Sequence, residues 1–286
     1  MMNIVGIGEV LWDVFGEQKT LGGAPANFAY HAAQQGVRGN VVSAIGNDEL
    51  GDETLKILEQ KKLFPHLQRV PAPTGTVPIT LDKNGVANYA FPPNVAWDYL
   101  QMTPELLSLA EQTNAVCFGS LAQRSAGTRA AIYQFLKAVP AGAIKIFDAN
   151  LRQDFYSDEV LLDSLALATM LKINEDEIGV FKKLLNCVPA TNDEFAKKLF
   201  EYFENLQHCV LTLGGAGSEI WTANGEHSKL ACDKSAPIVD TVGAGDSFTA
   251  TLVVALLAGT PLADAHAKAT RVATFVCSRK GAMPQY

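Results

Sequence analysis

Short runs of apolar and β-branched residues recur along the chain and predict buried strands. These runs cover residues 4–7, 41–45, 115–118, 144–147, 170–173 and 210–213. Segments with helical spacing of apolar positions lie between them, at residues 26–35, 52–61, 126–138, 158–168 and 192–205. Strands that alternate with helices are typical of an α/β fold with a mostly parallel sheet flanked by helices. Because such sheets bind ligands beyond the carboxyl ends of their strands, the residues that follow each run are the candidates for function.

One region departs from this alternation and predicts a small β layer. Residues 76–81 and 87–91 have the pattern of strands, and the sequence Asp-Lys-Asn-Gly at residues 82–85 is a strong hairpin signal. Pro78 cannot donate a ladder hydrogen bond, so its strand is expected at a sheet edge. Residues 10–15 are expected to add a further strand. The pattern leaves open whether this layer is a lid over a binding site or an edge hairpin without a role in one.

The composition supports a well-packed chain. Of 286 residues, 48% are hydrophobic and 19% are charged, which indicates a sizeable core and a length suited to one large α/β domain or two small ones. The net charge of −7 argues against a broad surface for nucleic acid or for an anionic membrane. The most apolar stretch, residues 252–258, is far shorter than the roughly 20 residues of a membrane span, and the start of the chain lacks the pattern of a signal peptide.

The cysteines favour a reducing compartment. There are five, scattered along the chain, and no two of them form a Cys-x-x-Cys pair. This spacing suggests neither a disulfide framework nor a structural zinc site. A cytoplasmic location is therefore expected.

A glycine-rich segment near the end of the chain has the pattern of an anion-binding loop. Residues 240–246 read Asp-Thr-Val-Gly-Ala-Gly-Asp and precede an apolar helical stretch at residues 247–258. The two glycines permit a positive φ and a close approach of a ligand, and the amides that open a helix attract anions. The segment therefore predicts a site for phosphoryl oxygens.

Asp246, the last residue of this segment, is a candidate catalytic base. A carboxylate would repel bound phosphate, but its presence makes sense if it accepts the proton of an attacking hydroxyl. The alternative is a helix cap, which an isolated motif of this kind would favour. The chain lacks the phosphate loop of P-loop enzymes and the catalytic loop of protein kinases. Gly6 and Gly8 are followed by Leu11 where a dinucleotide fingerprint has its third glycine, so a dinucleotide-dependent oxidoreductase is a weak alternative.

Polar residues follow the first strand and open the first helix. Asp13 is either an acceptor for sugar hydroxyls or a turn aspartate. Gly22 and Gly23 precede the helix, and Asn27 lies one turn inside it. Because asparagine is mildly unfavourable in a helix, its amide is expected to bond either a ligand or a neighbouring backbone group.

Three later strands also end in polar or glycine-rich segments. The fourth strand leads to Asp148 and Arg152, and Arg152 is a candidate for holding a phosphate or a pair of hydroxyls. The fifth leads to Asn-Glu-Asp-Glu at residues 174–177, whose carboxylates either position Mg²⁺ through water or only open a helix. The sixth leads to Gly-Gly-Ala-Gly at residues 214–217, which fits a flat or phosphorylated ligand or a plain tight turn.

In this order, these motifs resemble the ribokinase-like (PfkB) carbohydrate kinase family, and the resemblance covers nearly the whole chain. It rests on Gly-Gly-x3-Asn-x-Ala at residues 22–29, Ser-Ala-Ile-Gly-Asn-Asp-x2-Gly at 43–51, Asn-x-x-Glu at 174–177 and the glycine-rich segment at 240–248. The resemblance implies a single domain over residues 1–286 and a β lid, from about residues 10–20 and 74–98, that closes over a sugar. It also implies transfer of the γ-phosphoryl group of ATP to a sugar hydroxyl.

The resemblance assigns roles to individual residues. Asp246 is the implied base, and the implied anion hole consists of the amides of Gly243, Ala244 and Gly245. The implied sugar ligands are Asp13, Gly23 and Asn27. ATP is expected at Asn174, Thr212, Gly214, Gly217, Gly243 and Gly245, with Glu177 helping to place Mg²⁺. A monovalent cation such as potassium is expected near Asp240, Val242 and residues 279–282.

Within the family the chain looks most like bacterial fructokinases. The cues are Gly-Glu-x2-Trp-Asp at residues 8–13, Pro-Thr-Gly-Thr-Val at 73–77 and Asn-Val-Ala-Trp at 94–97. Similar stretches occur in 2-keto-3-deoxygluconate kinases, so that acidic sugar is the alternative substrate. Phe91, Gln123 and Arg152 are further candidates for the sugar pocket. A catalytically silent sugar or nucleotide sensor is the alternative of another class, and a homodimer through the lid face stays open.

Overall fold

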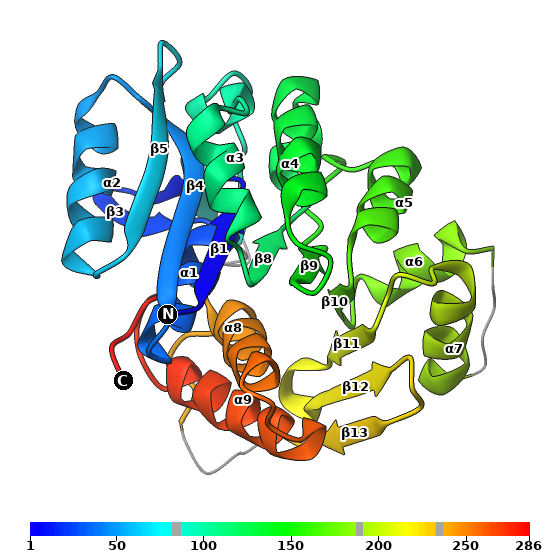
Figure 1. Ribbon diagram of the computed structural model, residues 1–286. Coiled ribbons are helices and arrows are strands. Elements are labelled where there is room, and N and C mark those ends of the chain that lie inside the picture. The colour runs from blue at the N-terminus through cyan, green and yellow to red at the C-terminus, as the bar shows by residue number, and fades with distance from the viewer. Residues whose placement is uncertain (82–86, 187–190, 233–236) are drawn as a thin grey trace.

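Two sheets and the helices around them make up the fold (Figure 1). The computed structural model describes residues 1–81, 87–186, 191–232 and 237–286. The central sheet has nine strands in the order β13-β12-β11-β10-β9-β8-β1-β4-β5. They are β1 (Asn3–Ile7), β4 (Arg38–Gly46), β5 (Phe64–Val70), β8 (Ala115–Phe118), β9 (Ile144–Asp148), β10 (Met170–Asn174), β11 (His208–Thr212), β12 (Ser218–Thr222) and β13 (His227–Leu230).

The central sheet is parallel from β5 through to β11, and only the β12–β13 edge is antiparallel. The predicted α/β fold with a mostly parallel sheet is confirmed. Strands β5, β12 and β13 were not predicted, because β5 and β13 are only partly buried edge strands with polar residues and β12 has no continuous apolar run. The loops that follow the parallel strands meet at one edge of the sheet, where such folds bind ligands.

Helices cover both faces of the central sheet. One face carries α1 (Ala24–Gln34), α2 (Glu49–Gln60), α8 (Ala244–Leu257) and α9 (Leu262–Cys277). The other carries α3 (Pro104–Glu111), α4 (Ala126–Ala138), α5 (Asp158–Leu167), α6 (Ile178–Leu184) and α7 (Asn192–Tyr202). Short 3₁₀ turns lie at η1 (Ala96–Tyr99), η2 (Leu121–Arg124) and η3 (Gly214–Ala216). Within the described ranges, no helix combines the length and apolarity that a membrane crossing requires.

Alternate residues of a central strand pack against opposite helical layers. On β10, Leu171 and Ile173 belong to the core beneath α3–α7, whereas Met170 belongs to the core beneath α8 and α9. This alternation follows from the two-residue period of side chains along a strand. It explains why the strands read as nearly continuous apolar runs, since both faces are buried.

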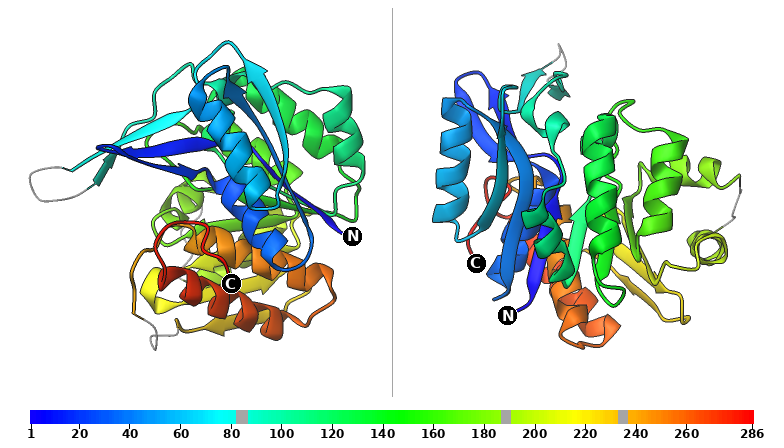
Figure 2. Two further views of the ribbon diagram at one scale, coloured as in Figure 1. Left: turned by 90° about the vertical axis from the view of Figure 1, so that its left-hand side faces the viewer. Right: turned by 45° about the horizontal axis from the view of Figure 1, so that its top comes forward.

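The second sheet is small and projects from the body of the molecule, as the left view of Figure 2 shows. It has the strand order β3-β2-β6-β7, formed by β2 (Leu11–Phe15), β3 (Gln18–Gly22), β6 (Thr76–Leu81) and β7 (Ala87–Tyr89). Strands β6 and β7 pair antiparallel, as the hairpin pattern predicts, and the predicted turn at residues 82–85 lies outside the described residues. Its role as a lid stays a prediction.

The expectation that Pro78 lies on an edge strand is wrong. Strand β6 is an inner strand, parallel to β2 on one side and antiparallel to β7 on the other. Pro78 is tolerated because it is the last residue paired with β2 and precedes Ile79, the first residue paired with β7. The missing N–H therefore falls where one ladder ends and the other begins.

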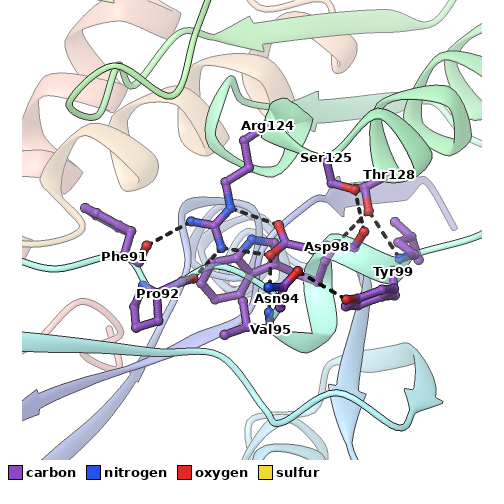
Figure 3. Close-up of polar contacts among 11 residues, drawn as sticks. Phe91, Pro92, Asn94, Val95, Asp98, Tyr99, Arg124, Ser125 and Thr128 are labelled. Atoms are coloured by element: carbon purple, nitrogen blue, oxygen red, sulfur yellow. Dashed lines mark hydrogen bonds and ion pairs between the residues drawn. The ribbon is translucent and has the colours of Figure 1, made fainter.

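A buried ion pair attaches the return of the small sheet to the body (Figure 3). Nε and Nη2 of Arg124 each donate to a carboxylate oxygen of Asp98 at 2.9 Å, and Arg124 also donates to the carbonyls of Phe91 and Pro92. The two side chains are each 9% exposed, and the guanidinium lies 5.1 Å from the Trp97 ring centroid. A bidentate pair with these additional acceptors holds the backbone at Phe91 in one place.

Candidate active site

A cavity of about 800 Å³ lies between the carboxyl edge of the central sheet, the small sheet and the start of α8. Its size suits a small-molecule ligand. The predicted site residues that line it are Asp13, Gly23, Asn27, Phe91, Arg152, Asn174, Thr212, Asp240, Val242, Gly243, Gly245 and Asp246. The predicted residues that do not line it are Gln123, Glu177, Gly214, Gly217 and Ala244.

Helix α8 begins at Ala244, three residues earlier than the sequence pattern suggests, with Gly243 as its N-cap at φ 79°. Gly245 and Asp246 therefore lie in the first turn, where amides have no carbonyl partner one turn earlier. The Ala244 amide differs, because it donates to the Thr241 carbonyl oxygen at 3.3 Å. Of the predicted anion-hole amides, those of Gly243 and Gly245 belong to residues that face the cavity. An anion is favoured at such a helix start.

The glycine-rich segment at residues 240–246, here called the anion loop, is held against residues 281–282 near the C-terminus. Asp240 accepts hydrogen bonds from the amides of Val242 and Gly281, at 3.0 and 2.9 Å. A Cβ placed on Gly243 would lie 2.5 Å from the Ala282 carbonyl oxygen. His31, which is fully buried, donates from Nε2 to that same oxygen at 2.8 Å. The structure thus brings residues 240–243 beside residues 281–282, where the resemblance expects a monovalent cation.

Asp246 accepts a hydrogen bond from Nδ2 of Asn27 at 2.8 Å. Burial raises the pKa of Asp246 to about 6, and the negative charge of Asp148 acts in the same direction. The hydrogen bond from Asn27 and the positive charges of Lys172 and Arg152 oppose that rise. A carboxylate with a pKa near 6 is ionised at neutral pH and is also basic enough to take a proton.

Asp13 and Gly23 lie at the small-sheet side of the cavity. Burial raises the pKa of Asp13, and the charge of Arg152 lowers it in part. Gly23 has φ 109°, and a Cβ there would lie 2.5 Å from the Glu9 carbonyl oxygen. Only glycine fits this position, because the backbone that follows β1 lies in contact with the backbone at the start of α1.

Glu9 is a cavity residue to which the sequence motif gave no role. It is 3% exposed, and its Oε2 has no hydrogen-bond partner among the described residues. Burial raises its pKa to about 7, the Arg152 charge lowers it, and the Asp246 charge raises it. The Oδ1 atom of Asn27 is likewise buried without a partner in the described ranges. Two acceptor atoms beside Asp246 thus lack donors, which hydroxyl groups of a ligand can supply.

Asn174 and Glu177 of the Asn-x-x-Glu motif bond each other's backbone amides. Oδ1 of Asn174 accepts from the amide of Glu177 at 3.0 Å, and Glu177 accepts in return from the amide of Asn174 at 2.9 Å. The other carboxylate oxygen of Glu177 accepts from the Leu151 amide at 2.7 Å. Burial raises the pKa of Glu177, and the nearby Lys172 charge lowers it. This carboxylate therefore ties together the segments that follow β9 and β10.

The nucleotide candidates lie around the end of β11. Thr212 lines the cavity, whereas Gly214 and Gly217 lie beyond it, in the turn that leads into β12. Gly217 has φ 108°, and a Cβ there would lie 2.0 Å from the Leu230 carbonyl oxygen. The structure therefore explains Gly217 by contact with the end of β13. Gly214 has φ 50°, which a tight turn also accounts for.

Gln123 is not brought into the cavity. It is 1% exposed, and its amide donates to the Gly119 carbonyl and to the Ser164 hydroxyl inside the fold. Its neighbour Leu121 lines the cavity instead. Phe91 does line the cavity, in edge-to-face contact with Phe155. The sequence pattern could not separate these residues, because all follow strands on the ligand side.

Lys172 lines the cavity but was not among the predicted site residues. It lies in the middle of β10 and is 7% exposed. The signal in the sequence is a single charged residue inside an apolar strand, which is rarely tolerated without a partner. That partner is Asp148, whose Oδ1 lies 3.1 Å from Nζ of Lys172.

Comparisons with known proteins show which family and fold the chain shares. The family model described as pfkB family carbohydrate kinase matches residues 5–285. A fructokinase of Klebsiella pneumoniae is 30% identical over 97% of this chain and 94% of its own length. The crystal structure of an uncharacterized sugar kinase from Pyrococcus horikoshii in complex with ATP is similar at a TM-score of 0.82, with 24% identity, over 99% of this chain and 94% of that one.

A further structure similar to this chain is that of a fructokinase from Vibrio cholerae bound to fructose, ADP and calcium ion. It has a TM-score of 0.80 and 24% identity, and the match covers 100% of this chain and 96% of that one. At this identity the likeness concerns the fold. The family match and the Klebsiella relative together identify the family, and the chain belongs to the pfkB family of carbohydrate kinases, which phosphorylate a hydroxyl group of a sugar.

Proposed function

We propose that this kinase is a fructokinase, which transfers the γ-phosphoryl group of ATP to a hydroxyl of fructose and yields fructose 6-phosphate. The observation that carries the proposal is the position of Asp246. It lies in the first turn of α8 beside the glycine amides, and Asn27 of α1 donates to it. In the proposed function Asp246 is the base, and this position between a helix start that would bind phosphoryl oxygens and a group of hydrogen-bonding side chains supports that role. The names of the Klebsiella and Vibrio relatives support fructose as the sugar.

The charges at the sugar end favour a neutral sugar. Glu9, Asp13 and Asp246 contribute carboxyl groups there, and Arg152 is the cation that interacts with all three. Lys172 also acts on Asp246, but it is paired with a fourth carboxylate, that of Asp148. A substrate carboxylate in this place would add a negative charge where acidic groups already outnumber Arg152 and Lys172, which costs binding free energy. Sugar hydroxyls can instead donate to these carboxylates. The balance therefore favours fructose over 2-keto-3-deoxygluconate.

The proposed reaction uses the two ends of the cavity together. The sugar hydroxyl oxygen attacks the γ-phosphorus, the bond from that phosphorus to the bridging oxygen of ADP breaks, and the hydroxyl proton passes to Asp246. The amides of Gly243 and Gly245 stabilise the charge on the phosphoryl oxygens. Closure of the small sheet over the sugar would exclude water, which otherwise competes for the phosphoryl group.

Glu177 and Asp240 are the carboxylates expected near metal ions. Their hydrogen bonds suit a hydrated ion that binds together with ATP. Both carboxylate oxygens of Glu177 and both of Asp240 already accept backbone amides. Direct ligation is thus less suited to these groups than contact through water, which Mg²⁺ retains readily. Bound Mg²⁺ would neutralise charge on the phosphates of ATP. A requirement for potassium, a homodimer and a cytoplasmic location stay predictions.

A screen of ADP release over candidate sugars tests the substrate. Fructose is expected to give the highest kcat/KM, above tagatose, ribose, adenosine and 2-keto-3-deoxygluconate, because a neutral ketose matches the charges of the cavity. The measurement is a coupled ADP assay with ATP and Mg²⁺, with and without potassium. Highest kcat/KM with 2-keto-3-deoxygluconate would assign Arg152 to a substrate carboxylate and reject fructose. Sugar binding without any ADP release would indicate a silent sensor.

The pH dependence of turnover tests the base. Because the pKa of Asp246 is raised to about 6, the carboxylate is protonated below that pH and cannot accept the hydroxyl proton. We expect kcat to be constant above that pKa and to fall about tenfold per pH unit well below it. Glu9 titrates nearby, at about 7, so the profile of Glu9→Gln is the control and should keep the fall near 6. A profile that stays flat down to about pH 4 would contradict the assignment.

A further inference from the structure

A lysine and an aspartate form a buried ion pair beneath the anion loop. Lys172 on β10 and Asp148 at the end of β9 have side chains that are 8% and 5% exposed, and Nζ lies 3.1 Å from Oδ1. Lys172 has the strand parity of Met170, so its side chain is directed to the layer of α8. Buried pairs cost desolvation energy and are often replaceable by apolar residues without loss of stability. The pair therefore invites a functional explanation.

The ammonium lies against the backbone of the anion loop. A Cβ placed on Gly245 would lie 3.2 Å from Nζ of Lys172. Gly245 is thus the residue that lets this cation approach the first turn of α8. The carboxylates of Asp148, Glu177 and Asp246 all act on Lys172, and although burial alone would lower its pKa, they raise it above the ordinary value. Lys172 is therefore a permanent cation at physiological pH.

Charged and titratable groups from several elements surround Asp246. They are Glu9 beyond β1, Cys117 on β8, Asp148 on β9, Arg152 beyond β9 and Lys172 on β10. Asn27 of α1 adds the hydrogen bond. Among the described groups that act on Asp246, Asp148 and Lys172 are also bonded to each other. Their charges act on the candidate base with opposite sign.

We propose that Lys172 and Asp148 are a positioning pair, in which Asp148 holds the ammonium under the anion loop and the ammonium keeps Asp246 in its carboxylate form. The pair is proposed to act through Asp246, so its catalytic relevance rests on the proposed role of that residue. Without Lys172, three buried carboxylates (Asp148, Glu177 and Asp246) would lack their shared cation. The remaining negative charge would then disfavour the ionised form of Asp246.

The pKa of Asp246, measured in two variants, separates the effects of the two charges. Asp148→Asn removes the negative charge while keeping the side-chain shape, so the pKa of Asp246 should decrease by about half a pH unit or more. Lys172→Met added to Asp148→Asn should then increase it again, because only the cation is lost in that step. The double variant is used because Lys172→Met alone leaves the negative charge of Asp148 buried without its partner, which would mix the two effects. A purely structural pair would not give shifts of opposite sign.

The shifts are measured in two ways, so that failure of the inference and failure of the proposed function differ. The acid limb of the kcat profile reports the base during turnover. Carbon-13 NMR of the Asp246 carboxyl, assigned by its absence in Asp246→Asn, reports the same group without any substrate. Opposite NMR shifts in a protein that phosphorylates no sugar would support the pair and reject the function. An Asp246 signal that titrates within about 0.2 pH unit of the native protein in both variants would overturn the pair.

The native chain supplies a second measurement if a variant does not fold. The interaction is reciprocal, so ionisation of Asp246 must be felt at Lys172. In the nitrogen-15 spectrum of lysine side chains, one Nζ signal should shift as Asp246 titrates near pH 6, and the shift should vanish in Asp246→Asn. Lysine signals that do not change through this range in the native protein would overturn the inference.

Discussion

Asp246→Asn is expected to lower kcat by roughly 10²–10⁴-fold, the range for loss of general base catalysis. The amide has nearly the same shape as the carboxylate but cannot accept the hydroxyl proton at neutral pH. Asn27 donates to Asp246 from Nδ2, and the amide oxygen of the new side chain can accept the same hydrogen bond. The measurements are kcat in a coupled ADP assay and the Kd of ATP by calorimetry, which should stay close to the native value.

The matched control is Asp163→Asn, the same substitution at an exposed residue of α5 outside the cavity. It should leave both kcat and the ATP Kd near their native values. Turnover of Asp246→Asn within about threefold of the native rate would remove Asp246 from the role of base. Asp246 would then be only an acidic residue in the first turn of α8, because the N-cap of this helix is Gly243 and not Asp246, the cap that the isolated motif would suggest.

Gly243→Val is expected to lower kcat by roughly 10²-fold or more, which is the effect of losing one preorganised donor to a developing charge. Gly243 has φ 79°, and a new Cβ would lie 2.5 Å from the carbonyl oxygen and 2.8 Å from the Cα of Ala282. These neighbours are backbone atoms, so the anion loop and the C-terminal segment must separate. The strained backbone should also reduce the free energy of unfolding by about 1–3 kcal/mol.

The control for this substitution is Gly142→Val. Gly142 precedes β9 and has an ordinary φ, and a Cβ placed on it would meet no described atom within 4 Å. We expect native turnover from it, together with an unfolding free energy changed by less than about 1 kcal/mol. An active Gly243→Val protein with native stability would show that the loop tolerates displacement and that its amides do not hold the phosphoryl group.

The sequence predicted those parts of the fold that are buried on both faces. The strand at Ala115–Phe118 and the helix at Ala126–Ala138 have the predicted bounds, because an apolar run or a helical spacing marks them without interruption. Strand β5 was missed, since it pairs on one side only and carries Pro65 and Arg69. The place of Pro78 was wrong because pairing partners from distant parts of the chain decide whether a strand is inner or edge.

For the site, the sequence motifs identified two kinds of residue. Some need an unusual backbone conformation, and others lie at the end of a strand or the start of a helix. Asn27 and Asp246 were named separately, and the structure brings them into a hydrogen bond. Glu9 and Lys172 were not named, because their chemistry comes from burial and from neighbours on other strands, which one sequence does not display. Gln123 follows a strand on the ligand side, but its direction depends on contacts with Gly119 and Ser164.

The hydrogen bond between Asn27 and Asp246 joins positions 219 residues apart, and it has a consequence for synthesis of the chain. Asn27 leaves the ribosome well before Asp246 and before Ala282, which contacts the anion loop. A nascent chain therefore carries Asp13, Gly23 and Asn27, the predicted sugar ligands, before it carries the predicted base or anion loop. If Asp246 is the base, a chain that stops before this residue is not expected to transfer phosphate through the site.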